Sequence, residues 1–492
     1  MFVGTGSDVG KSFITTGFCR IFRQDGYAPA PFKAQNMSLN SYATPEGLEI
    51  GRAQAVQAEA CGIPCHTDMN PVLLKPTTDK TSQVILHGKP AGNFSAAEYF
   101  LSGNRESLFE EVKKAWHRLS GRYSPIVMEG AGSISELNLK HRDITNMRMA
   151  IEAGAATYLI ADIDRGGVFG SLYGTLSLLD AEERRHIKGI IINKFRGDPH
   201  LFTDGRAELE KICEVPVIGV LPLRRDIIIE EEDSLAGKKR KTGEQRRSGL
   251  AKDKVNIAVV LLQRLSNFTD FDRLERDPRI HLFYTREPED ITAADIIILP
   301  GTKNTLEDLL ELKKNGVAQA IHQAFTDQRT VIGICGGYQM MGHLIEDPLH
   351  VESGIDAVAG LGLLPVHTIM QAEKTTRQRV FRFRDLATDC MGYEIHMGKT
   401  RTVSGDPQDE RPLNEFNDGG LDGYFLNDKC WGTYLHGLLD NPVVIETLIA
   451  PYSNRSGETF DYRQYKEEQY DKLANMLREH IDMNEIYKTL QS

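Results

Sequence analysis

The chain has 492 residues, 40% of them hydrophobic and 26% charged, a composition that predicts several globular domains. Its formal net charge of −11 gives no general attraction to nucleic acid or to anionic membranes. No apolar run approaches the roughly 18 residues of a transmembrane helix, and the N-terminus lacks a signal-peptide pattern. Seven scattered cysteines are typical of a reducing compartment. We therefore expect a cytoplasmic protein without nucleic-acid or membrane partners.

Residues 1–236 alternate short apolar runs with helical stretches. The apolar runs break into Gly, Asp, Asn or Pro, and they lie at 123–133, 156–167, 187–197 and 215–222. Buried parallel strands follow this pattern, with functional loops at their carboxyl ends. The pattern predicts a first doubly wound α/β domain.

Residues 237–253 differ from what precedes them, because they are basic, polar and almost free of large apolar side chains. This composition predicts a linker between domains. A nucleic-acid patch is the alternative interpretation, although the stretch lacks interleaved aromatic residues and the whole chain is acidic.

A second α/β series spans residues 254–450 and predicts a second doubly wound domain. Its apolar runs lie at 254–262, 294–305, 330–342, 361–367 and 430–441. Residues 451–492 are first polar and then helical, and we expect this tail to pack on the body of the protein. The residues at helical spacing in the tail are Leu473, Met476, Leu477 and His480.

The first candidate site is the N-terminal sequence GTGSDVGKS, which resembles a phosphate-binding P-loop. Gly6 and Gly10 let backbone N–H groups turn toward phosphate oxygens, Lys11 would reach the β- and γ-phosphates, and the Ser12 hydroxyl would hold Mg²⁺. The standard pattern has another glycine five residues before Gly10, where this chain has threonine. We expect ATP and Mg²⁺ here; a glycine-rich turn without a ligand is the alternative.

Polar side chains at later strand ends could complete this site. Glu129 follows an apolar strand, at the place of a second metal ligand. Asp162 and Asp164 end another strand, and Asn193 lies where a purine could be contacted. An acid at a strand end is often only a helix cap. Because the carboxyl ends of parallel strands meet at one edge, we expect the four positions to share a site.

The second candidate site is the sequence TVIGICGGYQM, in which Cys335 has the G-x-nucleophile-x-G surroundings of a nucleophile elbow. Small neighbours permit the strained strand–turn–helix that exposes the side chain, and a thiolate gains from the helix dipole. A packed core cysteine is the alternative, but packing alone does not require glycine at 333, 336 and 337. We expect a nucleophile.

A nucleophilic thiol requires a base, and His436 at the end of a late strand is the candidate. Gly301 and Thr302 offer backbone donors for an oxyanion. This layout resembles the class I glutamine amidotransferases, in which a cysteine attacks the glutamine side-chain amide, forms a glutamyl thioester and releases ammonia. The form G-x-C-x-G-x-Q of that family is also present, which implies that Gly336 and Gln339 serve the oxyanion or the glutamine.

The chain departs from that family after the histidine. The common triad has an acid two residues later, as H-P-E, whereas Gly437 and Leu438 follow His436 here. Another group must therefore orient the imidazole, and Glu394 and His396 are the candidates by sequence.

Motifs along nearly the whole chain extend the resemblance. The P-loop together with EGAGS is similar to dethiobiotin synthetase-type ATPases, which also activate carboxylates. The ordered set resembles the cobyric acid synthase family. Its members are FKAQNMSLNSY (32–42), MNPVLLKP (69–76), ADIDRGGVF (161–169), INKFRGD (192–198), SNFTDFD (266–272), PGTKNT (300–305), GICGGYQMMG (333–342), GYEIHMG (392–398) and GTYLHGL (432–438).

The resemblance implies amidation of the b, d, e and g carboxylates of adenosylcobyrinic acid a,c-diamide in cobalamin biosynthesis, with ATP and glutamine as co-substrates. An acyl phosphate would form in the first domain and react with ammonia from the second. By family position, Lys33 would face the transferred phosphoryl group, and Asn36 and Asn40 would grip the substrate. The implied partners are small molecules, a corrin polycarboxylate and glutamine; no oligomeric state is indicated.

Two other interpretations stay open. Partition and septum-site ATPases share the α/β core, but they carry a second lysine where this chain has Gly6, and they have no use for a thiol domain. An amidoligase acting on another polycarboxylate, such as cobyrinic acid, is the closer alternative. The related a,c-diamide synthases carry an acidic GPDYxDP-like stretch after an early lysine, whereas AQNM follows Lys33 here.

Overall fold

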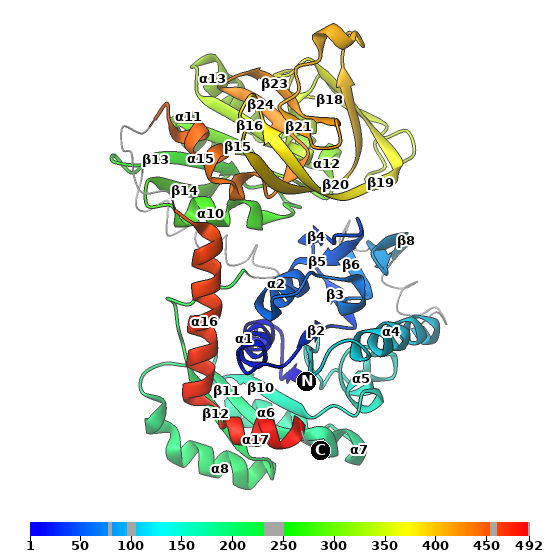
Figure 1. Cartoon of the computed structure of the whole chain (residues 1–492), viewed down its shortest axis with the longest axis vertical. Coiled ribbons are helices and arrows are strands. Elements are labelled where there is room, and N and C mark those ends of the chain that lie inside the picture. The colour runs from blue at the N-terminus through cyan, green and yellow to red at the C-terminus, as the bar shows by residue number, and fades with distance from the viewer. Residues whose placement is uncertain (77–80, 96–104, 231–249, 453–459, 491–492) are drawn as a thin grey trace.

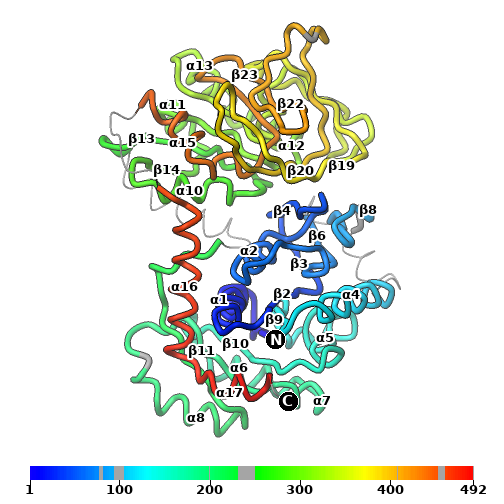
Figure 2. The backbone as a smooth tube through the Cα atoms, viewed as in Figure 1, coloured from blue at the N-terminus to red at the C-terminus, as the bar shows by residue number. Residues whose placement is uncertain are grey.

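The computed structural model describes residues 1–76, 81–95, 105–230, 250–452 and 460–490 (Figure 1). Two α/β bodies follow one another along the chain, and the C-terminal helices return to the first (Figure 2). None of the helices in these described stretches has both the length and the apolar character that a membrane crossing requires.

The first body is built on a parallel four-stranded sheet. In spatial order the strands are β1 (Phe2–Gly4), β10 (Thr157–Asp162), β11 (Ile187–Phe195) and β12 (Val217–Pro222). A parallel pair, β2 (Ala30–Phe32) and β9 (Ile126–Met128), adjoins it where Glu129 bridges Phe2. All six residues of β10 are buried, which explains its unbroken apolar run.

Smaller strands and helices surround this sheet. One sheet holds β3 (Gln35–Met37), β6 (Val72–Pro76), β7 (Thr81–Leu86) and β8 (Lys89–Ser95), and a hairpin holds β4 (Ser41–Ala43) and β5 (Glu49–Gly51). The helices are α1 (Lys11–Gln24), α2 (Arg52–Cys61), α4 (Arg105–Ser120), α5 (Met147–Glu152), α6 (Val168–Ser177), α7 (Ala181–His186) and α8 (Thr203–Cys213).

The second body has a six-stranded sheet, parallel except at one edge. Its order is β14 (Ile280–Thr285), β13 (Val255–Val260), β15 (Ile296–Leu299), β16 (Thr330–Ile334), β24 (Cys430–Thr433) and the antiparallel β23 (Tyr424–Asn427). Its helices are α10 (Asp272–Arg276), α11 (Pro288–Ala293), α12 (Thr305–Lys314), α13 (Val317–Thr326), α14 (Gly336–Met341) and α15 (Pro442–Ile449).

A second sheet in this body faces the first body. It contains β17 (Leu344–Glu346), β18 (Ala357–Ala359), β19 (Val366–Phe383), β20 (Asp389–Thr402), β21 (Asn414–Phe416), β22 (Leu421–Asp422) and β25 (Leu435–His436). The β19–β20 hairpin contacts β4 across the boundary (Figure 1). The apolar pattern did not indicate this hairpin, because half of β19 is polar and partly exposed.

The C-terminal tail packs on the first body. Helix α16 (Tyr462–His480) lies along α1, and α17 (Met483–Leu490) follows it. Leu473 and Leu477 pack with Phe18 in one buried cluster, and a Cβ at Gly17 would lie 2.2 Å from a Leu477 methyl carbon. The expected fold class, two doubly wound α/β domains, is confirmed. Most of the expected linker at 237–253 lies outside the described residues.

Candidate active sites

Cys335 stands on a sharp turn between β16 and α14. Its φ of 52° and ψ of −111° are strained for a residue with a side chain. The neighbouring glycines make the turn possible, because a Cβ at Gly337 would lie 1.9 Å from the Leu299 carbonyl oxygen. A Cβ at Gly333 would lie 2.7 Å from the carbonyl carbon of Gly337. The glycines therefore serve a strained elbow that holds the thiol in place.

His436 is oriented by an aspartate that the sequence did not single out. Its Nδ1 lies 2.6 Å from Oδ2 of Asp270, whose other oxygen accepts from the Gly437 amide at 2.9 Å. Asp270 belongs to the short helix η4 (Phe268–Phe271). Glu394, a candidate by sequence, pairs instead with Arg379 and with His396.

The electrostatics of His436 favour its charged form. Burial lowers its pKa, but the Asp270 carboxylate and then Cys335 outweigh burial and raise the pKa to about 10. The Tyr393 ring stacks on the imidazole with 5.4 Å between centroids. A protonated imidazole beside the thiol stabilises a thiolate, which is the nucleophilic form.

Two backbone amides adjoin the thiol. Gly336 begins α14, so its amide has no acceptor within the helix. The Thr302 nitrogen lies 3.1 Å from the point that a Cβ of Gly336 would occupy. Gly301 packs against His436 and Cys335, since a Cβ added at this glycine would lie 3.1 Å from Cε1 of His436 and 3.6 Å from Cβ of Cys335. These amides can receive an oxyanion formed at the thiol.

A small cavity opens beside Cys335. Gln339 lines it and is held at both ends of its amide, accepting from the Thr305 hydroxyl and donating to the Tyr434 hydroxyl, each at 3.2 Å. Lys75, on β6 of the first body, also lines this cavity. Both bodies therefore contribute to the wall of the thiol site.

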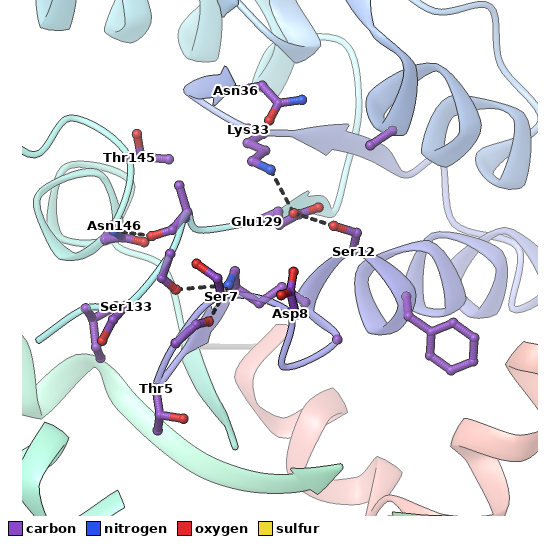
Figure 3. A pocket seen from close by; sticks show the side chains of 18 of the residues that line it. Thr5, Ser7, Asp8, Ser12, Lys33, Asn36, Glu129, Ser133, Thr145 and Asn146 are labelled. Carbon is purple, nitrogen blue, oxygen red and sulfur yellow. Dashed lines mark hydrogen bonds and ion pairs between the residues drawn. The ribbon is translucent and has the colours of Figure 1, made fainter. Parts of the chain in front are cut away.

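The P-loop residues gather at the N-terminus of α1 (Figure 3). Lys11 Nζ donates to the carbonyl oxygens of Gly6 and Gly132, each at 2.9 Å. The Ser12 hydroxyl donates to Oε1 of Glu129 at 2.7 Å. The Lys11 ammonium group thus lies inside the loop, where phosphate oxygens bind in P-loops.

Glu129 accepts hydrogen bonds from several side chains of this site. It is 1% exposed, and it accepts from Lys33 Nζ at 3.0 Å and from Gln57 Nε2 at 2.6 Å. Burial raises the pKa of Glu129, but Lys33 and the hydrogen bonds from Ser12 and Gln57 outweigh this and lower it. Ser12 and Glu129 oxygens this close suit one Mg²⁺, which prefers oxygen ligands and completes its shell with phosphate and water. The residues present therefore fit the metal.

Asn193 supports the loop from the next strand. Its Nδ2 donates to the Val9 carbonyl at 2.9 Å, and a Cβ at Gly10 would lie 2.1 Å from that nitrogen. Gly10 also has a φ of +99°, so only glycine is suited to this position. The amide nitrogen expected to meet a purine is thus bound to the P-loop backbone.

Of the four strand-end positions, the structure brings only Glu129 and Asn193 to the pocket. Asp162 lies outside the pocket lining and pairs with Lys194 at 2.9 Å. Asp164 likewise lies outside and forms an ion pair with Arg196.

Asn36 and Asn40 have different surroundings. Asn36 lines the pocket and donates to Gln54 Oε1 at 3.0 Å. Asn40 was expected to grip the substrate, but it lies at the boundary between the bodies, where its Oδ1 accepts from the Phe268 amide at 3.2 Å. The chain leaves the pocket after β3 and turns toward the second body, which explains the difference.

The pocket around the P-loop measures about 2000 Å³ and is rich in cationic side chains. The lysines and arginines that line it are Lys11, Lys33, Arg105, Lys140, Arg142, Arg148, Arg165, Lys194, Arg224, Arg225 and Arg276. Such a pocket is large enough for more than a nucleotide and favours anionic ligands.

A buried ion cluster joins the bodies. Glu49 of β5 accepts from Lys75 at 2.7 Å through Oε1 and from Lys374 of β19 at 2.5 Å through Oε2. Burial raises the pKa of Glu49, but the two lysines outweigh this and lower it well below its usual range. Burial also lowers the pKa of Lys374 to about 7. The cluster borders the thiol cavity, which both lysines line.

Comparisons with known proteins agree with this arrangement. Residues 1–235 match the CobQ/CobB/MinD/ParA nucleotide binding domain, and residues 256–444 match the CobB/CobQ-like glutamine amidotransferase domain. Fold and sites thus define a glutamine amidotransferase joined to a nucleotide-binding domain.

Over its whole length the chain is 60% identical to a cobyric acid synthase of Bacteroides fragilis and 59% identical to one of Parabacteroides distasonis. It is 44% identical to one of Klebsiella pneumoniae, and it covers 98% of each of the three. The chain belongs to the cobyric acid synthase family, glutamine-dependent amidotransferases of cobalamin biosynthesis.

Proposed function

We propose that this enzyme uses ATP and glutamine to amidate the b, d, e and g carboxylates of adenosylcobyrinic acid a,c-diamide. A carboxylate oxygen of the corrin attacks the γ-phosphorus of ATP, which gives an acyl phosphate and ADP. Ammonia then attacks the acyl carbon, phosphate leaves, and an amide remains. The same site would act in turn on all four carboxylates.

The observation that carries the proposal is the shared wall of the thiol cavity. Lys75 extends from the nucleotide-binding half into the cavity of Cys335. At neutral pH free ammonia is mostly ammonium and diffuses away, so a synthetase gains from a source of ammonia beside it. The contact between the halves supports one reaction rather than two separate activities.

In the glutaminase half, the Cys335 thiolate attacks the side-chain amide of glutamine. The Thr302 and Gly336 amides stabilise the oxyanion, and His436 delivers its proton to the departing ammonia. Asp270 keeps the imidazole in the required tautomer and orientation. Water, deprotonated by the now neutral His436, hydrolyses the thioester and releases glutamate.

In the synthetase half, Lys11 and the P-loop amides bind the β- and γ-phosphates of ATP. Ser12 and Glu129 would hold Mg²⁺, which would neutralise phosphate charge when bound. Lys33 forms an ion pair with Glu129 and lines the pocket, where it could contact the transferred phosphoryl group. Asn193 holds the P-loop in shape.

The acceptor follows from the charge and size of the pocket. Lysines and arginines outnumber carboxylates around a volume of about 2000 Å³, which suits a macrocycle carrying several carboxylates beside a nucleotide. Asn36 on the pocket wall can donate to a corrin carboxylate or to the acyl phosphate. Asn40, which lies between the bodies, is left out of this role.

We further propose limits for the parts: a synthetase domain at 1–236, a linker at 237–253, a glutaminase domain at 254–450 and a helical tail at 451–492. We also propose a cytoplasmic location, because all seven cysteines are free thiols and such thiols persist in a reducing compartment.

Mass spectrometry of the corrin tests the function. Wild type with ATP, Mg²⁺, glutamine and adenosylcobyrinic acid a,c-diamide is expected to add four amides. Cys335→Ala is expected to add them only when ammonium replaces glutamine. If the corrin is unchanged while glutamine is still hydrolysed with ATP, the acceptor is wrong; cobyrinic acid would then be tried.

A further inference from the structure

Three lysines line the cavity beside Cys335, and two of them share one carboxylate partner. Lys75 and Lys374 each bind one oxygen of Glu49, at 2.7 and 2.5 Å. These two therefore have a carboxylate partner within the protein before any substrate binds. The third is Lys303, which immediately precedes the N-cap of α12.

Lys303 is 7% exposed and faces the cavity. Among the residues that the structure describes, Lys303 has no ion pair and no side-chain hydrogen bond; its backbone amide donates to the Arg264 carbonyl at 3.0 Å. Burial lowers the pKa of Lys303, and Glu352 only partly opposes this. A buried ammonium without a partner is costly, so this side chain is suited to an anionic ligand.

Glu352 supplies the opposite charge at the same cavity. Its Oε2 accepts from the Thr305 amide at 3.0 Å, and the residue lines the cavity. Asp347 fixes the loop that carries it by accepting from the amides of Val351, Glu352 and Ser353 at 2.8–3.1 Å. The carboxylate is thus held in place on the cavity wall rather than carried on a free loop.

We propose that Lys303 binds the α-carboxylate of glutamine and Glu352 its α-ammonium group. The assignment rests on the proposed function, which places the side-chain amide of glutamine at Cys335. A zwitterionic head group would satisfy the buried Lys303 and the partly buried Glu352 at once, with the chain of the amino acid extending to the thiol. The two residues would then select glutamine from other primary amides.

Two analogues separate the two contacts. 4-Aminobutanamide is glutamine without its α-carboxylate, and 4-carbamoylbutanoate is glutamine without its α-amino group. Ammonia release from each is measured for wild type, Lys303→Met and Glu352→Gln. Loss of a charge partner in this cavity is expected to lower kcat/KM by roughly 100-fold.

Lys303→Met should therefore lose roughly 100-fold on glutamine yet hydrolyse 4-aminobutanamide as wild type does. Glu352→Gln should lose activity on glutamine but not on 4-carbamoylbutanoate. Ammonium-dependent amidation should persist in both variants, which shows that they fold. Lys314→Met, at the exposed end of α12, is the matched control and should match wild type throughout.

Equal losses on glutamine and on 4-aminobutanamide in Lys303→Met would overturn the assignment, as would no loss on glutamine. Wild type that hydrolyses 4-aminobutanamide as fast as glutamine would overturn it without any variant. Failure of the proposed function looks different: Cys335→Ala would then still release ammonia from glutamine, whatever the lysine variants do.

Discussion

Asp270 and His436 are 166 residues apart in the chain, yet their side chains meet at 2.6 Å. The short helix η4 and the end of β25 bring them together beside Cys335. In the proposed triad, the acid therefore comes from the N-terminal side of the domain and not from the residues after the histidine.

Asp270→Asn is expected to reduce glutamine hydrolysis by about 10²–10⁴-fold, because the imidazole loses its tautomer and its charge partner. Glutamate release measures this, and ammonium-dependent amidation should be nearly unchanged. Glu394→Gln is the comparison, since that residue binds Arg379 and not His436. An equal loss in both variants would contradict the role of Asp270.

The charge of His436 predicts a pH-dependent stability. Its pKa lies at about 10 in the fold, above the ordinary 6.5, so its contribution is complete below pH 6.5 and is lost as the pH rises through about 10. The melting temperature of wild type should exceed that of Asp270→Asn at about pH 6, and the gap should close by about pH 10. Groups that titrate equally in both proteins cancel. A constant gap would show that the imidazole is neutral in the fold.

Lys11→Met should abolish amidation with either glutamine or ammonium, by at least about 100-fold, because the phosphates lose their cation. Corrin mass and ADP release report this loss. Hydrolysis of glutamine at Cys335 should persist at a basal level. The control is Lys188→Met, an exposed lysine of the same body, which should behave as wild type. Normal ADP release in Lys11→Met would rule out the assigned nucleotide site.

Glu49→Gln removes the carboxylate that two buried ammonium groups share. The cost is expected to be about 3–5 kcal/mol, and the melting temperature should fall accordingly. Helix α2 directly follows β5, and its Gln57 donates to Glu129 in the nucleotide site. Because Glu49 on β5 also pairs with lysines at the thiol cavity, its loss should weaken the coupling of the two sites and raise the amount of glutamate released per amide formed. Glu485→Gln, which breaks an exposed pair with Lys488, should cost under about 1 kcal/mol. An unchanged ratio in Glu49→Gln would argue against coupling through this cluster.

The sequence predicted the features that local chemistry determines. Glycines around Cys335 and Gly10 indicated an elbow and a P-loop, because each is required by a backbone approach or a positive φ. Apolar runs predicted the parallel strands because those strands are buried on both faces.

Asp270, Lys303 and Glu352 could not be found in this way. The role proposed for each depends on a contact made by the tertiary fold, which the neighbouring residues in the sequence do not reveal. Asn40 was assigned a substrate role by family position, and the structure places it at the boundary between the bodies, where it binds the Phe268 amide. Asp270 did lie within the SNFTDFD motif, which carried the family resemblance without revealing its purpose.

Helix α16 has a consequence for how the molecule could be divided. It follows the glutaminase half in sequence but fills the core of the other half, where Leu473 and Leu477 meet Phe18 and two acidic residues pair with Arg20. If the chain were cleaved in the proposed linker, the C-terminal fragment would still carry α16, which forms part of the hydrophobic core of the N-terminal half. Co-expressed fragments should therefore reassemble by complementation, whereas an N-terminal fragment alone would expose an apolar groove along α1.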